Sequence, residues 1–119
     1  MNYARLISYC AKLPHATSER KWENTLVFSV QKKMFALFLL DKRNKPTELW
    51  CKVDDDVFLS YTDQPGICPA PYLARAKWVA IESSAMTDAM ARQVVQRARD
   101  IIFMKLPKRV QHELRTKET

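Results

Sequence analysis

The chain has 119 residues, of which 47% are apolar, and its formal net charge is +7. This length suits one domain, and the apolar share is too high for a disordered chain. The longest apolar run, from Met34 to Leu40, is much shorter than the about 20 residues that span a bilayer. The first residues lack the pattern of a signal peptide. We therefore expect a cytoplasmic protein with no membrane partner.

The excess of basic residues favours a polyanionic partner, because Lys and Arg side chains release counterions when they neutralise phosphates. A basic surface that only keeps the protein soluble is the alternative. The three cysteines, Cys10, Cys51 and Cys68, are odd in number and have no CxxC spacing. They predict free thiols in a reducing compartment, with neither a disulfide framework nor a zinc site.

The first predicted element is a helix that Asn2 caps and Pro14 ends. Residues 15–24 are polar and predict a loop, with Trp22 as an anchor. Strands are predicted over 25–30, 33–40 and 47–53, joined by a turn at 31–32 and a polar loop at 41–46.

The second half of the chain predicts a short helix that begins at Asp54-Asp55-Asp56 and ends near Tyr61, then an irregular loop over 62–71. A fourth strand follows over 77–82, and Thr87 caps a last helix that ends near Pro107. The fold class is therefore α+β, in the order α-β-β-β-α-β-α. We expect a two-layer sandwich, with a mostly antiparallel sheet of about four strands and the helices on one face. Residues 1–107 form the predicted domain, and 108–119 a polar, frayed tail.

Four segments resemble the signature blocks of the MmcQ/YjbR family, in order and spacing: YARLISYCAKLPHA (3–16), VFSVQKKMFALF (27–38), LWCKV (49–53) and GICPAPYLARAKWVAIE (66–82). The resemblance extends to about Phe103. It implies a compact fold similar to the bacterial frataxin CyaY and to the double-wing module of a phage transcription activator. On that analogy, members are commonly labelled DNA-binding. One departure is Lys32, which stands in the first hairpin turn where many members have Gly.

No catalytic constellation is recognisable in the sequence, so we predict a module that is not an enzyme and uses no cofactor. His15 and His112 stand at opposite ends of the chain, in polar segments. The acidic run at 54–56 could bind a hard cation, but helix capping is the simpler interpretation. A frataxin-like iron site is not expected either, because residues 1–18 contain no Asp or Glu.

The predicted sheet suggests a binding face. If one alternating set of side chains points toward the helices, period-2 geometry sends Phe38, Trp50, Lys52 and Trp78 outward. The inward set is Leu26, Phe28, Val30, Phe35, Leu37, Leu39, Leu49, Cys51, Val79 and Ile81. Exposed indoles beside a lysine would form a stacking platform for single-stranded nucleic acid. They could also form a patch for a protein partner, or be core residues beneath the loop at 61–76.

The sequence as a whole predicts a small nucleic-acid-binding module, with DNA preferred over RNA, that acts as a monomer. The predicted site residues are Lys32, Lys33, Lys42, Arg43, Lys45, Trp50, Lys52, Arg75, Lys77 and Trp78. The basic members could clamp a phosphate backbone, or could be scattered solvated charges. The alternative function is a protein-interaction module that uses the sheet face as frataxins do.

Overall fold

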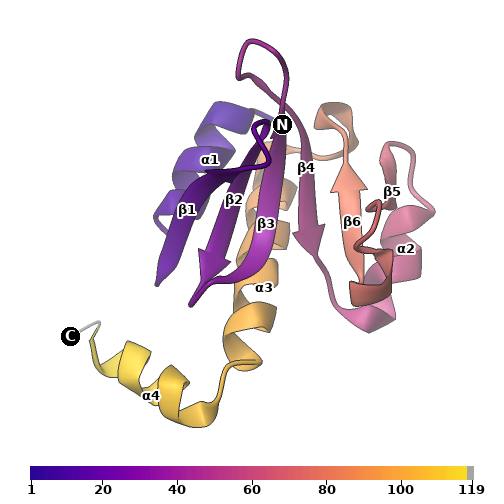
Figure 1. Cartoon of the computed structure of the whole chain (residues 1–119). Coiled ribbons are helices and arrows are strands. Elements are labelled where there is room, and N and C mark those ends of the chain that lie inside the picture. Colours follow the sequence, from indigo (N-terminus) through magenta and orange to yellow (C-terminus); the bar gives the residue numbers. More distant parts are fainter. Residues whose placement is uncertain (118–119) are drawn as a thin grey trace.

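A computed structural model describes residues 1–117 as one sheet with helices packed on it (Figure 1). The helices are α1 (Tyr3–Ala11), α2 (Phe58–Thr62), α3 (Asp88–Met104) and α4 (Lys108–Thr116), and the single-turn 3₁₀ helices are η1 (Asp55–Val57), η2 (Ala74–Ala76) and η3 (Ser83–Ala85). The strands are β1 (Ala16–Lys21), β2 (Thr25–Val30), β3 (Lys33–Leu40), β4 (Pro46–Lys52), β5 (Ile67–Pro69) and β6 (Trp78–Ile81). No helix within residues 1–117 has the length and apolarity needed to cross a membrane.

The two main helices begin where the sequence predicts caps. Asn2 Oδ1 accepts a hydrogen bond from the Arg5 amide at 3.0 Å, and Thr87 Oγ1 accepts one from the Met90 amide at 3.2 Å. Each side chain satisfies an amide that has no partner within the helix. The buried residues of α3 fall at helical spacing along one side, so this helix presents an apolar stripe to the sheet.

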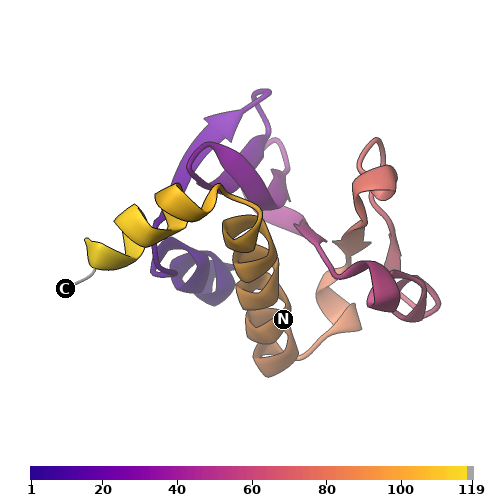
Figure 2. The same cartoon turned by 90° about the horizontal axis from the view of Figure 1, so that it is seen from below.

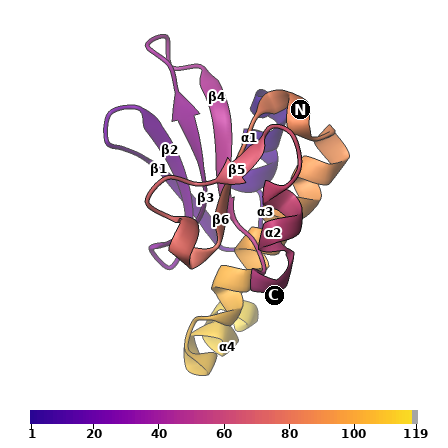
Figure 3. The same ribbon diagram turned by 90° about the vertical axis from the view of Figure 1, so that its right-hand side faces the viewer.

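The sheet has six strands in the order β1-β2-β3-β4-β6-β5, and every neighbouring pair is antiparallel. Helices α1 and α3 lie together on one face, and among residues 1–117 no helix of comparable length lies on the other face (Figures 1 and 3). The prediction of an α+β, mostly antiparallel two-layer fold is confirmed. The prediction of about four strands was wrong: the sheet has six, because β1 and β5 form where loops were predicted.

A β-bulge at Phe35 reverses the predicted facing of β3. Phe28 pairs with Ala36 while Ser29 pairs with Met34, so Phe35 is an extra residue in its strand. Both Phe35 and Ala36 then pack in the helix-side core, and the alternation after them is inverted. Phe38 therefore points toward the helices and is fully buried, whereas Leu37 and Leu39 lie on the opposite face. The prediction of an outward Phe38 was wrong for this reason.

The expectation of a frayed segment from Lys108 was also wrong over residues 108–116, which form α4. This helix packs on the end of α3 through Leu114, which is buried. Gln111 Nε2 donates to the carbonyls of Met104 at 3.1 Å and Leu106 at 2.8 Å, which anchors α4 to the turn that precedes it. Residues 118–119 of the predicted tail lie outside the described part of the chain.

Candidate nucleic-acid interface

The face of the sheet opposite α1 and α3, here called the outer face, is apolar over much of its area. Strand pairing places Thr25, Val27, Leu37, Trp50 and Ala80 on it. Buried residues of this face form a second, smaller hydrophobic cluster, separate from the core beneath the helices. The segment 70–77 folds over one part of this face (Figure 3), and the part beside it forms an open groove.

The covered part contains two predicted site residues. Trp78 is only 4% exposed, and it packs in the cluster with Ala70 and Leu73. Lys52 is buried beside it, where Nζ donates to the Ala76 carbonyl at 2.5 Å and lies 3.6 Å from Asp55 Oδ1. The expectation that these side chains are exposed was wrong, because the segment that precedes β6 covers them. For Trp78 the alternative of a core residue beneath the loop at 61–76 is the one observed. Burial lowers the pKa of Lys52, and the nearby charge of Lys105 lowers it further.

The open part is a groove of about 400 Å³ with aromatic rings on its rim. Its lining residues are Trp22, Thr25, Met34, Leu37, Leu39, Trp50, Pro71, Tyr72 and Leu73. Trp22 is 63% exposed and Tyr72 is fully exposed, while Trp50 is half-buried and its Nε1 donates to Glu48 at 2.5 Å. Of the three rings, only Trp50 belongs to the predicted site. Trp22 and Tyr72 lie in turns, so strand alternation could not assign them to this face.

The predicted basic residues divide between the two ends of the strands. Lys42, Arg43 and Lys45 are exposed in the β3–β4 loop, at the end where the β1–β2 turn presents Trp22. Arg20 Nη2 links these turns by donating to the Glu23 carbonyl at 2.7 Å and to Asn44 Oδ1 at 2.9 Å. This arrangement places the three bases beside one rim of the groove.

At the opposite end of the strands, Lys32, Lys33 and Arg75 are exposed. Lys32 also lines a polar hollow of about 490 Å³ on the outer face, together with Thr17 and Ser29. Lys77 is half-buried, and its Nζ lies 5.1 Å from the centre of the Phe58 ring. Its charge is thus directed toward α2, and Lys77 is less accessible than the prediction required.

Two residues of the acidic run at 54–56 form ion pairs, Asp54 with Arg97 and Asp55 with Lys52, while Asp55 and Asp56 lie in the first turn of η1. Asp54 makes no capping hydrogen bond, and its carboxylate accepts two bonds from Arg97, both at 2.9 Å. These hydrogen bonds lower the pKa of Asp54. Within residues 1–117, no group of three or more His, Cys, Asp or Glu side chains is placed to hold a metal ion.

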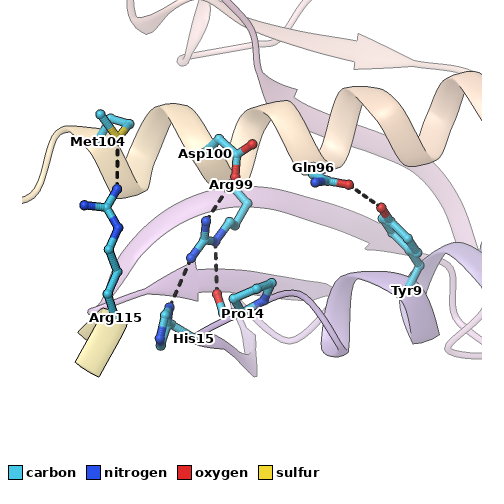
Figure 4. A network of polar contacts seen from close by, with 8 residues as sticks. All are labelled: Tyr9, Pro14, His15, Gln96, Arg99, Asp100, Met104 and Arg115. Atoms are coloured by element: carbon cyan, nitrogen blue, oxygen red, sulfur yellow. Dashed lines mark hydrogen bonds and ion pairs between the residues drawn. The ribbon is translucent and has the colours of Figure 1, made fainter. Parts of the chain in front are cut away.

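Arg99 is a buried polar residue of α3 that the sequence analysis did not single out. Its Nε donates to the Pro14 carbonyl, its Nη1 contacts Asp100 Oδ1 and its Nη2 contacts His15 Nδ1, each at 3.0 Å (Figure 4). His15 Nε2 lies 2.9 Å from the Leu114 carbonyl. With its proton on Nε2, His15 satisfies both contacts and connects α3 to α4.

A sequence model of the YjbR family matches residues 11–101. The chain belongs to the YjbR family. This confirms the resemblance carried by the four sequence blocks, three of which lie wholly within the matched region. No curated protein sequence matches this YjbR protein.

Two solved structures from Pseudomonas syringae share the fold of this YjbR protein. A crystal structure has 19% sequence identity and a TM-score of 0.70, and the match covers 86% of this chain and 99% of that one. A solution NMR structure has 20% identity and a TM-score of 0.63, with 82% and 90% covered. At these identities the likeness concerns the fold alone, and α4 lies outside the region that the family model matches.

Proposed function

We propose that this YjbR protein binds nucleic acid, single-stranded DNA in preference to RNA, across the outer face of its sheet. The observation that carries the proposal is the open groove, whose rim presents Trp22 and Tyr72 to solvent. Aromatic rings on an exposed sheet stack on unpaired bases, and each stacked base contributes about 1–3 kcal/mol of binding free energy. A duplex hides its bases from such rings, so a single strand fits better.

The charge distribution supports the same partner. The groove lining contains no charged side chain, whereas Lys42, Arg43 and Lys45 lie at one end of the strands and Lys32 and Lys33 at the other. In this arrangement bases occupy the apolar groove while phosphates reach the basic turns. Backbone contacts of this kind fix the position of the strand without reading its sequence.

The test is titration of a fluorescently labelled single-stranded DNA, and of the RNA of the same sequence, at several salt concentrations. We expect the logarithm of the affinity to fall linearly with the logarithm of salt, by about 0.7 for each phosphate neutralised. The double variant Trp22→Ala/Tyr72→Ala should weaken binding about tenfold or more, in line with the loss of one stacked base. Charge reversal of Lys42 and Lys45 to Glu should weaken binding and reduce the salt dependence.

Two exposed side chains away from the groove supply matched controls. Leu59 in α2 is 72% exposed, and Arg92 is exposed on α3. Leu59→Ala and Arg92→Glu should leave the affinity close to that of the unmodified protein. If neither DNA nor RNA binds at low salt, or if the groove variants bind as well as the controls, the proposal is wrong.

A protein-interaction module is the second candidate, favoured by the mainly apolar lining of the groove. Exposed apolar grooves with Trp and Tyr at the rim are typical of protein contact sites. For such a partner the groove variants would reduce binding as before, but the affinity would depend weakly on salt. The slope of affinity against salt therefore separates the two candidate functions.

A further inference from the structure

The C-terminal segment 105–117 concentrates positive charge. It contains five Lys and Arg residues and one Glu, so it holds more than half of the net charge of +7. The basic residues are Lys105, Lys108, Arg109, Arg115 and Lys117. This segment lies beyond the part of the chain that the family model matches.

Helix α4 exposes part of this charge to solvent. Gln111 and Leu114 are buried against the preceding turn and the end of α3, and Val110 is half-buried beside them. Lys108 and Arg109 are exposed on the other side of the helix, as helical spacing requires. The docking contacts therefore fix which side of α4 meets solvent.

The five bases of this segment have no carboxylate partner within 4 Å among residues 1–117. Two of the three arginines of α3 are different, because Arg97 pairs with Asp54 and Arg99 with Asp100. Clustered cations without counter-charges repel one another, so this part of the surface attracts an external anion.

A cleft of about 450 Å³ between α3 and α4 adds a more specific feature. The guanidinium carbon atoms of Arg99 and Arg115 lie 4.4 Å and 5.1 Å from the centre of the Phe103 ring, and both arginines line the cleft. The donors of Arg99 are used by protein acceptors. Among residues 1–117, the one hydrogen-bond acceptor of the Arg115 guanidinium is Met104 Sδ, at 3.9 Å (Figure 4). Sulfur is a weak acceptor, so the Arg115 guanidinium retains donors for a phosphate oxygen.

We propose that α4, with Arg109 and Arg115 as its main contacts, binds the phosphate backbone of the nucleic acid that the outer face holds. This inference rests on the proposed function. Helix α4 lies beyond the end of the sheet where β2 turns into β3, the end that carries Lys32 and Lys33 (Figures 1 and 2). A strand that leaves the groove at this end meets a second basic surface.

A nucleic acid fits this surface better than an anionic membrane. The outward side of α4 presents Lys108, Arg109 and His112, all exposed, and its apolar residues are turned toward the protein. Helices that bind in a membrane interface bury an apolar face among the lipids, and α4 has already buried its own.

The double variant Arg109→Gln/Arg115→Gln tests the inference, with the labelled single-stranded DNA as the probe. It should weaken binding at low salt and reduce the slope of affinity against salt by about 1.4, the value for two phosphate contacts on a single strand. The matched control is Arg5→Gln/Arg92→Gln, which removes two exposed arginines from α1 and α3. The control should bind like the unmodified protein, with an unchanged slope.

Comparison with the groove variant Trp22→Ala/Tyr72→Ala separates the two proposals. If the groove variant loses affinity while Arg109→Gln/Arg115→Gln does not, the inference on α4 is wrong and the proposed function stands. If only the α4 variant loses affinity, the groove is not the binding face.

Loss of binding to vesicles of phosphatidylcholine and phosphatidylserine, with DNA binding unchanged, would assign α4 to a membrane and overturn the inference. Should the double variant melt at a lower temperature, Lys108→Gln repeats the test at a residue with no docking contact.

Discussion

The three tryptophans show how burial determines what one kind of side chain can do. Trp22 is 63% exposed in a turn, Trp50 is half-buried in the groove and Trp78 is 4% exposed beneath the segment 70–77. An exposed ring is available to a ligand, whereas a buried ring stabilises the fold through the apolar area it removes from water. Only the first two can contribute directly to binding.

We expect Trp78→Ala to lower the free energy of unfolding by about 3–5 kcal/mol, because it leaves a large cavity in the outer cluster. Trp22→Ala should change it by less than about 0.5 kcal/mol, as is usual for an exposed position. Urea unfolding followed by far-ultraviolet circular dichroism measures both. Equal effects of the two substitutions would show that the segment 70–77 does not cover Trp78 in solution.

The thiols should differ in the same way. Cys68 is exposed, whereas Cys10 and Cys51 are fully buried, so a thiol reagent should modify one cysteine quickly and the other two only on unfolding. Burial raises the pKa of Cys10 to about 12 and raises the pKa of Cys51 as well.

Stability should therefore fall as the pH rises above about 8.5, where an unfolded thiol ionises but the folded one remains protonated. The contribution of Cys10 is fully present below that pH and is lost as the pH approaches about 12. Denaturant unfolding across this range should show a shallower alkaline loss for Cys10→Ala than for the unmodified protein. An identical pH dependence would contradict the burial of this thiol.

At the scale of elements, the β2–β3 turn is a point of local strain. Its two central residues, Gln31 and Lys32, have φ values of 50° and 67°, as a two-residue hairpin turn requires. Side chains other than Gly are disfavoured in this left-handed region. The turn thus keeps its short length despite the absence of glycine.

Lys32→Gly should raise the free energy of unfolding by about 0.5–1 kcal/mol, because glycine adopts the left-handed conformation without steric conflict. The matched control is Lys33→Gly, which places glycine in the extended strand β3 and should lower stability by a similar amount. Thermal melting of the two variants gives the comparison. A lower melting temperature for Lys32→Gly would mean that the turn is longer in solution.

Elements with a clear apolar pattern could be predicted from the sequence, and those held by tertiary contacts could not. The stripe of α3 and the alternation in 25–30 predicted a helix and a strand at the right places. Strand β1 is almost entirely polar, and it forms because its backbone pairs with β2 at the edge of the sheet. The bulge at Phe35 leaves no mark in an apolar run, yet it decides which residues face the groove. The packing of α4 depends on the side-chain amide of Gln111 and on Leu114. Two buried positions are too few to form an apolar stripe that would predict this packing from the sequence.

At the scale of the whole molecule, the sheet separates the main hydrophobic core from the proposed binding face. Helices α1 and α3 cover one face and complete the main core (Figures 1 and 3). The outer face carries the groove, and exposed bases lie in the turns at both ends of the strands. Helix α4, on which Lys108 and Arg109 are exposed, lies at one end of the molecule (Figure 2). The proposed ligand would therefore contact segments that are far apart in the sequence. A single substitution tests only one of these contacts, so a measurement over the whole chain is needed.

Hydrogen exchange with and without single-stranded DNA tests this arrangement over the whole chain. Bound DNA should slow exchange in four places: the β1–β2 turn at 22–24, the β3–β4 loop at 41–45, the segment 71–73 and α4. Exchange in α1 through local opening should not change, because the sheet lies between this helix and the outer face. The amides of α1 are an internal control for general stabilisation by a ligand, which would slow exchange from global opening everywhere. Slower exchange confined to α2 or α1 would place the ligand elsewhere and contradict both proposals. Protection of the three groove segments without α4 would retain the groove and reject the helix as a second contact.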